Sequence, residues 1–338
     1  MTEPLRLHAN ENLLGPSPMA VAAMQEACLN ANFYPQNHEA ILLEKLAAHI
    51  GHGIRPEQFV LGNGSADVLR MLVQHHGLPD AEIVVPRPTF VAYKRLTRVH
   101  RANLVEVPLI DYQIDFDGLI NAITDKTTLL FLCNPNNPTG LYVNHQEMAD
   151  FLARVPEHVC VVVDEAYHDF VDVDDFPRMM EFVNAGYNVI VARTFSKVYG
   201  LASMRVGYGY GPEHVIAPIR DTRVRSEMGI MAYAGAAAAL ADEAHIVNSI
   251  EMVQEGREFY YKEFDRLGLK YLRSQAFFIT VEDPPVPAQQ IVDEALKQGV
   301  LLRHADVFDM PGYLRVSIGR PEDNKRVIEV LENIFQNG

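Results

Sequence analysis

The chain has 338 residues, which is enough for one large domain or two smaller ones around a sizeable core. Its composition is 48% hydrophobic and 22% charged, and 44 acidic against 29 basic residues give a formal net charge of −15. Such a surface repels phosphate backbones, so the composition argues against a nucleic-acid partner. The longest apolar run, residues 230–241, is too short to span a bilayer, so we expect no membrane association.

The N-terminal segment MTEPLRLHANEN lacks a basic region followed by an apolar stretch, so we expect no signal peptide. The three cysteines, Cys28, Cys133 and Cys160, lie far apart and without the spacing of metal ligands. We therefore expect free, buried thiols in a reducing, cytoplasmic environment and no metal site.

Short apolar runs alternate with helical patterns between residues 58 and 211. We predict strands at 58–62, 81–86, 102–109, 127–132, 158–163 and 188–193. Apolar residues at helical spacing between them predict helices within 63–74, 87–100, 145–155 and 177–185. This alternation predicts an α/β fold, a three-layer sandwich with a largely parallel central sheet and helices on both faces.

The last third of the chain has a different pattern. A long amphipathic helix within 242–267 is followed by the strand-like FFITVED, a helix at 287–299, the strand-like VLLRH and LRVSIG, and a final helix at 322–335. This order predicts a second, smaller α+β domain. We divide the chain into an N-terminal arm and helix that joins the smaller domain (1–40), a large domain (41–241) and the smaller domain itself (242–338).

Residues directly after the predicted strands are candidates for ligand binding, because ligands of open α/β sheets bind beyond the carboxyl ends of the strands. The turn 62–65, GNGS, precedes a helix and offers backbone N–H groups to a phosphate, or is a plain tight turn. Asn137, within NPNNPTG (134–140), is either a side-chain donor to a ligand or part of a rigid loop. Asp164 ends an apolar strand, where it either meets a cation or caps the next turn.

A lysine follows the strand 188–193, in the segment RTFSKVYGLASMRVGYGYG. Most lysines are solvated surface residues, but a buried amine loses proton affinity and becomes a nucleophile. Lys197 is preceded by the hydroxyls of Thr194 and Ser196, and Arg205 follows eight residues later. Because this lysine follows a strand as Asn137 and Asp164 do, we expect all of them to face one crevice.

Together these groups supply a phosphate cradle, a carboxylate, an amide and a lysine. Pyridoxal 5′-phosphate needs such a set, because its aldehyde binds a lysine and its ring nitrogen pairs with a carboxylate. The residues therefore predict this cofactor.

In these motifs the sequence resembles the fold-type I pyridoxal-phosphate aminotransferases, and in particular the histidinol-phosphate aminotransferase group. The resemblance runs from HANENLLGPSP (8–18) through YPQN, GNGSAD, RPTF, NPNNPTG, DEAY and TFSKVYGLASMRVGY to LLRH and LRVSIG. It covers nearly the whole chain.

The resemblance implies a role for each matching residue. Lys197 would bind the cofactor covalently and then act as the general base, and Asp164 would keep the ring nitrogen protonated. The other implied cofactor contacts are Asn137 and Tyr167 with the 3′-oxygen, Phe90 with the ring, and Ser65, Ala66, Asp67, Thr194, Ser196 and Arg205 with the phosphate.

The resemblance also implies a homodimer with shared active sites, in which Tyr34 reaches the cofactor phosphate of the partner subunit. On the substrate side, Arg315 would clamp the α-carboxylate as a two-pronged donor, with Asn10 and Arg303 as further substrate-binding residues. The implied reaction transfers an amino group from an amino acid or amino phosphate to a 2-oxo acid.

Other reactions on the same cofactor stay open, namely threonine-phosphate decarboxylation, amino-acid racemisation and oxidase-type chemistry, because the shared cofactor residues do not separate them. A non-catalytic pyridoxal-phosphate regulator is disfavoured, because the chain has no spare length or basic segment for a DNA-binding module. A nicotinamide dehydrogenase is disfavoured because no GxGxxG follows a strand.

The sequence departs from the family pattern at several positions. Leu13 and Leu14 stand where a proline and a polar or aromatic residue are common, SEMGIM (226–231) replaces a Pro–aromatic–Asn triplet, and Phe277 stands where asparagine is frequent. We expect these positions to lie near the substrate. The loss of polar contacts there disfavours histidinol phosphate and favours a donor with a different side chain.

Overall fold

The computed structural model describes residues 3–223 and 227–337. Its strands are β1 (Leu5–Arg6), β2 (Phe59–Asn63), β3 (Glu82–Arg87), β4 (Asn103–Pro108), β5 (Thr127–Cys133), β6 (Cys160–Asp164), β7 (Val189–Thr194), β8 (Val206–Tyr210), β9 (Lys270–Leu272), β10 (Phe278–Glu282), β11 (Val300–Leu301), β12 (Arg303–His304) and β13 (Leu314–Ser317).

The α-helices are α1 (Pro18–Cys28), α2 (His38–Ile50), α3 (Ser65–His76), α4 (Ala92–His100), α5 (Phe116–Asn121), α6 (His145–Leu152), α7 (Met179–Asn184), α8 (Glu213–Asp221), α9 (Ile230–Ala239), α10 (Glu243–Arg266), α11 (Ala288–Lys297) and α12 (Pro321–Asn337). Short 3₁₀ turns are η1 (Pro56–Gln58), η2 (His168–Phe170), η3 (Ala202–Met204) and η4 (Ala305–Phe308).

The central sheet has seven strands in the order β2-β8-β7-β6-β5-β3-β4. The six strands predicted between residues 58 and 193 are confirmed as β2 to β7, and they run parallel. Strand β8 was not predicted from the sequence, and it lies antiparallel between β2 and β7. Its alternating Gly207 and Gly209 weaken the strand pattern, but a Cβ at Gly207 would collide with the backbone nitrogen of Ser65.

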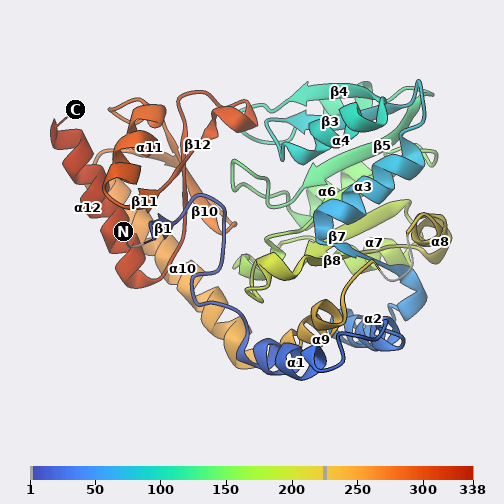
Figure 1. Cartoon of the computed structure of the whole chain (residues 1–338). Helices are drawn as coiled ribbons and strands as arrows, with labels where there is room; N and C mark the ends of the chain where they lie inside the picture. The colour runs from blue at the N-terminus through green and yellow to red at the C-terminus, as the bar shows by residue number, and fades with distance from the viewer. Residues whose placement is uncertain (1–2, 224–226, 338) are drawn as a thin grey trace.

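Helices cover both faces of this sheet, which confirms the three-layer sandwich (Figure 1). On one face, Val162 and Ile190 pack with the buried residues of α3, α4 and α8. On the other face, Val163 and Val191 pack with the buried residues of α5, α6 and α7. Successive side chains of β6 and β7 therefore point alternately to the two helical layers.

The smaller domain contains an antiparallel sheet in the order β12-β13-β10-β9, with α11 and α12 packed together beside it. Helix α10 runs from the region of α1 and α9 to this domain (Figure 1). In the N-terminal arm, β1 pairs with β11 of the smaller domain, whereas α1 packs against α9. The boundaries at residues 40 and 241 stay a prediction.

None of the helices in the described ranges combines the length and hydropathy that a bilayer crossing needs. All three cysteines are unpaired. Cys133 and Cys160 are buried as expected, but Cys28 is exposed at the end of α1, so the expectation of a buried thiol is wrong there. The helix turns its small residues, Ala20 and Ala27, inward instead.

Candidate active site

A cavity of about 510 Å³ lies at the carboxyl ends of the parallel strands, with walls from both domains and from the N-terminal arm. It is lined by His8, Ala9, Asn10, Glu11, Ser65, Ala66, Phe90, Val91, Cys133, Asn137, Asp164, Ala166, Tyr167, Thr194, Ser196, Lys197, Ala202, Arg205, Arg303, Val307, Phe308 and Arg315. Its position agrees with the rule that ligands of open α/β sheets bind at this edge.

Lys197 enters the cavity from the turn after β7. Its Nζ donates to the backbone carbonyl of Asn10 at 2.9 Å and lies 5.6 Å from the centre of the Tyr167 ring. Burial, with a smaller contribution from the nearby guanidinium of Arg315, lowers the pKa of Lys197 to about 8. The amine is therefore partly neutral near pH 8, as a nucleophile or general base must be.

Asp164 ends β6 and is only 2% exposed. Its Oδ2 accepts a hydrogen bond from the Tyr93 hydroxyl at 2.9 Å, whereas its Oδ1 is buried and has no partner. Burial raises the pKa of Asp164 to about 6. A buried carboxylate oxygen with no donor is costly, and a cationic N–H of a ligand would satisfy it.

The N-terminus of α3 forms the opposite end of the cavity. Arg205 lies over it, donating from NH2 to the Asn63 carbonyl at 3.3 Å and from NH1 to the Ala202 carbonyl at 2.7 Å. Thr194 Oγ1 and Ser196 Oγ are hydrogen-bonded at 2.9 Å beside it. Free N–H groups of a helix N-terminus, a guanidinium and two hydroxyls are groups that suit a phosphate monoester.

A second arginine lies toward the smaller domain. Arg315 of β13 is 4% exposed and donates from NH1 to Asn137 Oδ1 and from NH2 to the His8 carbonyl, both at 2.8 Å, while its Nε is buried without a partner. Burial lowers the pKa of Arg315 to about 10, so the guanidinium stays charged at neutral pH. Arg303 lies directly opposite on β12. The pair supplies positive charge for an anionic group of a substrate.

These residues fit pyridoxal phosphate. The phosphate site at α3, the unpartnered Oδ1 of Asp164 and the amine of Lys197 match the phosphate, the protonated ring nitrogen and the aldehyde of that cofactor. Phe90 also lines this cavity.

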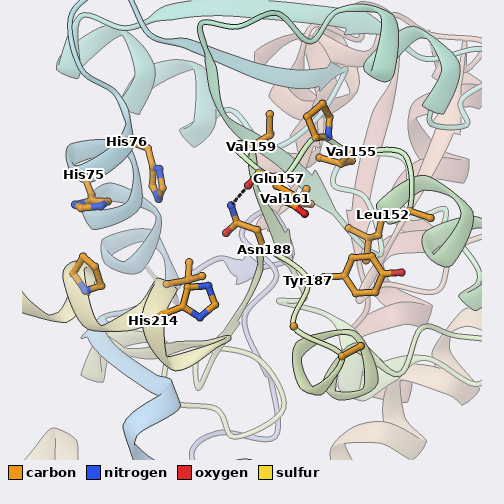
Figure 2. A pocket seen from close by; sticks show the side chains of 16 residues that line it. His75, His76, Leu152, Val155, Glu157, Val159, Val161, Tyr187, Asn188 and His214 are labelled. Carbon is orange, nitrogen blue, oxygen red and sulfur yellow. Dashed lines mark hydrogen bonds between the residues drawn. The ribbon is translucent and has the colours of Figure 1, made fainter.

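A larger cavity of about 700 Å³ lies at the opposite, amino-terminal end of the strands (Figure 2). Its lining includes His75, His76, His214 and Asn188, and none of its described lining residues is a lysine or arginine. Within residues 3–223 and 227–337, no group of three or more His, Cys, Asp and Glu side chains could hold a metal ion. This cavity therefore does not offer the chemistry of the first one.

Comparison with known proteins identifies the family. The family model for class I and II aminotransferases matches residues 2–331. The chain belongs to the class I and II aminotransferases. It is therefore an enzyme that depends on pyridoxal phosphate and transfers an amino group from an amino acid or amino phosphate to a 2-oxo acid.

This aminotransferase is 40% identical to a histidinol-phosphate aminotransferase from Moorella thermoacetica, over 98% of its own length and 85% of the relative. It is also 40% identical to one from Akkermansia muciniphila, over 98% and 90% of the two chains. Among solved structures, it matches histidinol-phosphate aminotransferase from Sinorhizobium meliloti in complex with pyridoxal-5′-phosphate. The match has a TM-score of 0.91 and 27% identity, and covers 99% and 92% of the two chains.

Most of the predicted site residues line the aminotransferase cavity. They are Asn10, Ser65, Ala66, Phe90, Asn137, Asp164, Tyr167, Thr194, Ser196, Lys197, Arg205, Arg303 and Arg315. Their individual roles stay predictions.

Asp67 and Tyr34 are not brought into this cavity. The carboxylate of Asp67 accepts from the backbone of Asn63 and from Arg70. Tyr34 is 80% exposed and lies in a separate depression beside Phe33 and Ile230. In a single chain Tyr34 therefore has no contact with the site.

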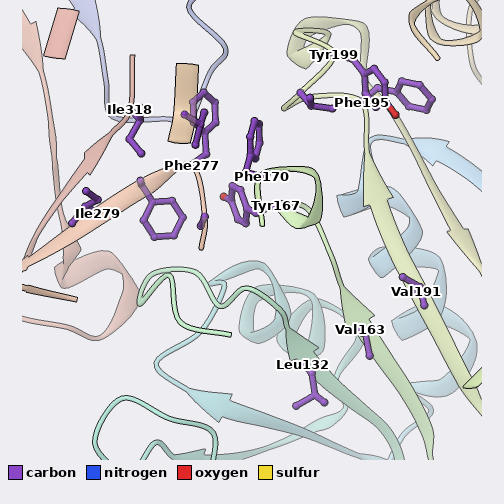
Figure 3. Packing of buried hydrophobic residues seen from close by; sticks show 14 of the residues in the cluster. Leu132, Val163, Tyr167, Phe170, Val191, Phe195, Tyr199, Phe277, Ile279 and Ile318 are labelled. Atoms are coloured by element: carbon purple, nitrogen blue, oxygen red, sulfur yellow. The ribbon is translucent and has the colours of Figure 1, made fainter. Parts of the chain in front are cut away.

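The expectation that the departures from the family lie near the substrate is wrong for Leu13 and Phe277, which pack in the core, and stays a prediction for Leu14 and residues 227–231. Phe277 is fully buried and stacks on Phe170 with ring centres 4.9 Å apart (Figure 3). Leu13 packs against the same core, and Leu14 is 40% exposed. Residues 227–231 do not line the cavity, and Ser226 lies outside the described residues. At Leu13 and Phe277 the departures thus change core contacts.

Several residues of the site were missed. Tyr93 bonds to Asp164, Glu11 lies in the wall beside Asn10, and Phe308 lies with its ring centre 4.9 Å from the guanidinium of Arg315. The position of Glu11 in HANEN, next to a predicted residue, was a usable signal. Phe308 lies in a short 3₁₀ turn without any local pattern.

Proposed function

We propose that this aminotransferase takes histidinol phosphate as its amino donor and a 2-oxo acid as acceptor. The names of the full-length relatives support this donor. The observation that carries the assignment of the site is the meeting of Lys197, the unpartnered carboxylate oxygen of Asp164 and Arg315 in one cavity. Arg303 beside Arg315 supplies a second cation, which suits a site that must accept a phosphate in one half-reaction and a carboxylate in the other.

Each residue then has a role. Bound pyridoxal phosphate supplies an aldehyde for the amino group and a protonated ring that accepts the electron pair of the breaking Cα–H bond. Lys197 binds the cofactor between turnovers, and its free amine removes the Cα proton and returns one. Asp164 holds the proton on the ring nitrogen, and Asn137 with Tyr167 orients the 3′-oxygen.

The remaining residues bind and orient. Ser65, Thr194, Ser196 and Arg205 bind the cofactor phosphate, together with the N-terminus of α3. Arg315 orients the anionic group of the substrate so that its Cα–H bond faces Lys197.

We further propose a cytoplasmic homodimer with shared sites. Leu29, Phe33 and Tyr34 are 82%, 65% and 80% exposed on the connection between α1 and α2, and Met231 of α9 is 37% exposed nearby. An apolar surface of this kind is typical of a subunit interface, and a second copy would bring Tyr34 toward its site. The unpaired cysteines suit a reducing compartment.

A donor screen tests this function. The holoenzyme is mixed with histidinol phosphate or with single L-amino acids, and conversion of the bound cofactor to its amine form is followed by absorbance. We expect histidinol phosphate to react with a kcat/KM at least about tenfold above any amino acid tested. Arg303→Gln is the matched variant, and its loss of rate should be larger for the phosphate-bearing donor. A faster reaction with an ordinary amino acid would exclude this donor assignment.

A further inference from the structure

A buried ion pair lies behind the strand ends that carry Asp164 and Lys197. Glu165 directly follows Asp164, and Arg193 directly precedes Thr194, so alternation points both side chains to the other face of the sheet. Arg193 donates a hydrogen bond from Nε to Glu165 Oε2 at 2.9 Å, and its NH2 forms an ion-pair contact of 2.8 Å with the same oxygen. Glu165 is fully buried and Arg193 is 8% exposed.

Other titratable groups lie close to this pair. The Nδ1 of His168 in η2 donates to the backbone carbonyl of Glu165 at 3.1 Å, and its Nε2 lies 3.3 Å from Asp169 Oδ1. The ring of Tyr210 lies 5.5 Å from the Arg193 guanidinium. The remaining groups are His49 of α2, whose Nε2 lies 3.5 Å from the Tyr199 hydroxyl, and Tyr208 of β8.

The positive charge of Arg193 favours the ionised forms of Glu165 and Asp169. Burial raises the pKa of Glu165 and raises that of Asp169 to about 7, and the Arg193 guanidinium opposes both shifts. The negative charge of Glu165 in turn raises the pKa of Asp164 on the other face. Arg193 therefore balances the charge that lies directly behind the carboxylate of the active site.

The backbone couples the pair to the cavity. Asp164 and Ala192 are register partners, and the N–H of Glu165 donates to the Ala192 carbonyl at 2.8 Å. The ion pair thus joins β6 and β7 at the last rung before the turn that carries Lys197. A slip of one strand end against the other would move the Asp164 carboxylate relative to the Lys197 amine.

We propose that Glu165 and Arg193 are positioning residues, whose buried ion pair fixes the ends of β6 and β7 and so sets the placement of Asp164 and Lys197 for pyridoxal phosphate. This assignment rests on the proposed roles of Asp164 and Lys197. A well-packed apolar pair would usually give equal or greater stability than a buried ion pair. The directed N–H···O bond from Arg193 Nε, together with the ion-pair contact of NH2, supplies what an apolar pair lacks, namely a fixed distance between the two strand ends.

The test compares Arg193→Met, Glu165→Gln and the double variant Glu165→Leu/Arg193→Met with the natural chain. Two quantities are measured: the Kd of the apoenzyme for pyridoxal phosphate, and the midpoint of the pH titration of the bound cofactor's absorbance. We expect a Kd about tenfold higher in each single variant, together with a displaced midpoint. The double variant should regain the lost Tm but keep the raised Kd. Arg193→Lys, which keeps the charge but not the forked donors, should lie between.

Arg257→Met is the matched control. Arg257 is also a buried arginine, 2% exposed, but it binds Asp172 and the carbonyls of Phe170 and Ser274 away from the cavity. Its loss should lower the Tm without changing the cofactor Kd or the titration midpoint.

Two outcomes would overturn the positioning role. One is an unchanged cofactor Kd and an unchanged titration midpoint in the double variant. If the double variant does not fold, the same result in Arg193→Lys counts instead. The other is an Arg257→Met variant with the same displaced midpoint as Arg193→Met. Borohydride labelling of the natural chain separates the two proposals, because label on Lys197 together with unchanged variants rejects the positioning role alone. Absence of label on Lys197 rejects the proposed function.

Discussion

Replacement of Asp164 by asparagine should stabilise the apoenzyme and disable the holoenzyme. The ionised carboxylate is buried with one oxygen unpartnered, and burial raises its pKa from 3.8 to about 6. A pKa shift of one unit corresponds to about 1.4 kcal/mol. The ionised carboxylate of Asp164 therefore lowers the free energy of unfolding of the apoenzyme by about 3 kcal/mol above pH 6. Asparagine avoids this charge and can still accept the hydrogen bond from Tyr93.

The sign of the effect follows from the raised pKa. Below pH 3.8 the carboxyl is protonated in both the folded and the unfolded state, so the penalty is absent there. It grows as the pH rises through about 6 and is then constant. The stability advantage of Asp164→Asn should therefore appear at pH 7.5 and shrink toward pH 4.

The assay is urea unfolding of both apoenzymes at several pH values, with turnover of the two holoenzymes measured in parallel. We expect a gain of about 1–3 kcal/mol at pH 7.5 and a loss of kcat of at least about 100-fold, because the ring nitrogen loses its charged partner. Natural-chain stability equal to or above that of the variant at pH 7.5 would refute the burial argument. Near-normal turnover would refute the role of Asp164.

Three further predictions concern other parts of the site. Arg315→Lys should raise the KM for the donor about 10–100-fold with a smaller change in kcat, because lysine cannot bond both Asn137 and the His8 carbonyl. An unchanged KM would contradict the role of Arg315 in binding the anionic group of the substrate. Tyr34→Phe should raise the cofactor Kd of the dimer about tenfold, although Tyr34 is exposed in one chain, and an unaffected Kd would argue against shared sites. The rate at which apoenzyme takes up pyridoxal phosphate should rise between pH 6 and 8, because Asp164 (pKa about 6) must ionise and Lys197 (pKa about 8) must lose its proton, and a flat profile would exclude this pairing.

Much of the site could be predicted because it lies at strand ends. A period-two or fully apolar run locates a strand, and topology then brings the next residue to one edge, as for Asn137, Asp164 and Lys197. Contacts made by distant segments leave no such pattern. Phe308 reaches the cavity through tertiary packing, and the strand β8 was hidden by glycines that the close approach of α3 requires.

The position of Phe277 shows a second limit. Phe277 directly precedes β10, and its side chain points to a different side from that of Phe278. The ring of Phe278 contacts Tyr167 of the cavity, whereas Phe277 enters the core against Phe170. Only the register of β10 with β13 decides this, and register between strands is set by the whole sheet. Tyr34 is a third case, because its proposed partner lies on another copy of the chain.

The assignment of Lys197 is tested most directly by borohydride reduction of the holoenzyme followed by peptide mass spectrometry. We expect the cofactor to be fixed to Lys197 alone, and Lys197→Ala to carry no fixed cofactor and no measurable turnover. Fixation to another lysine in the natural chain, or fixation that persists in Lys197→Ala, would contradict the account.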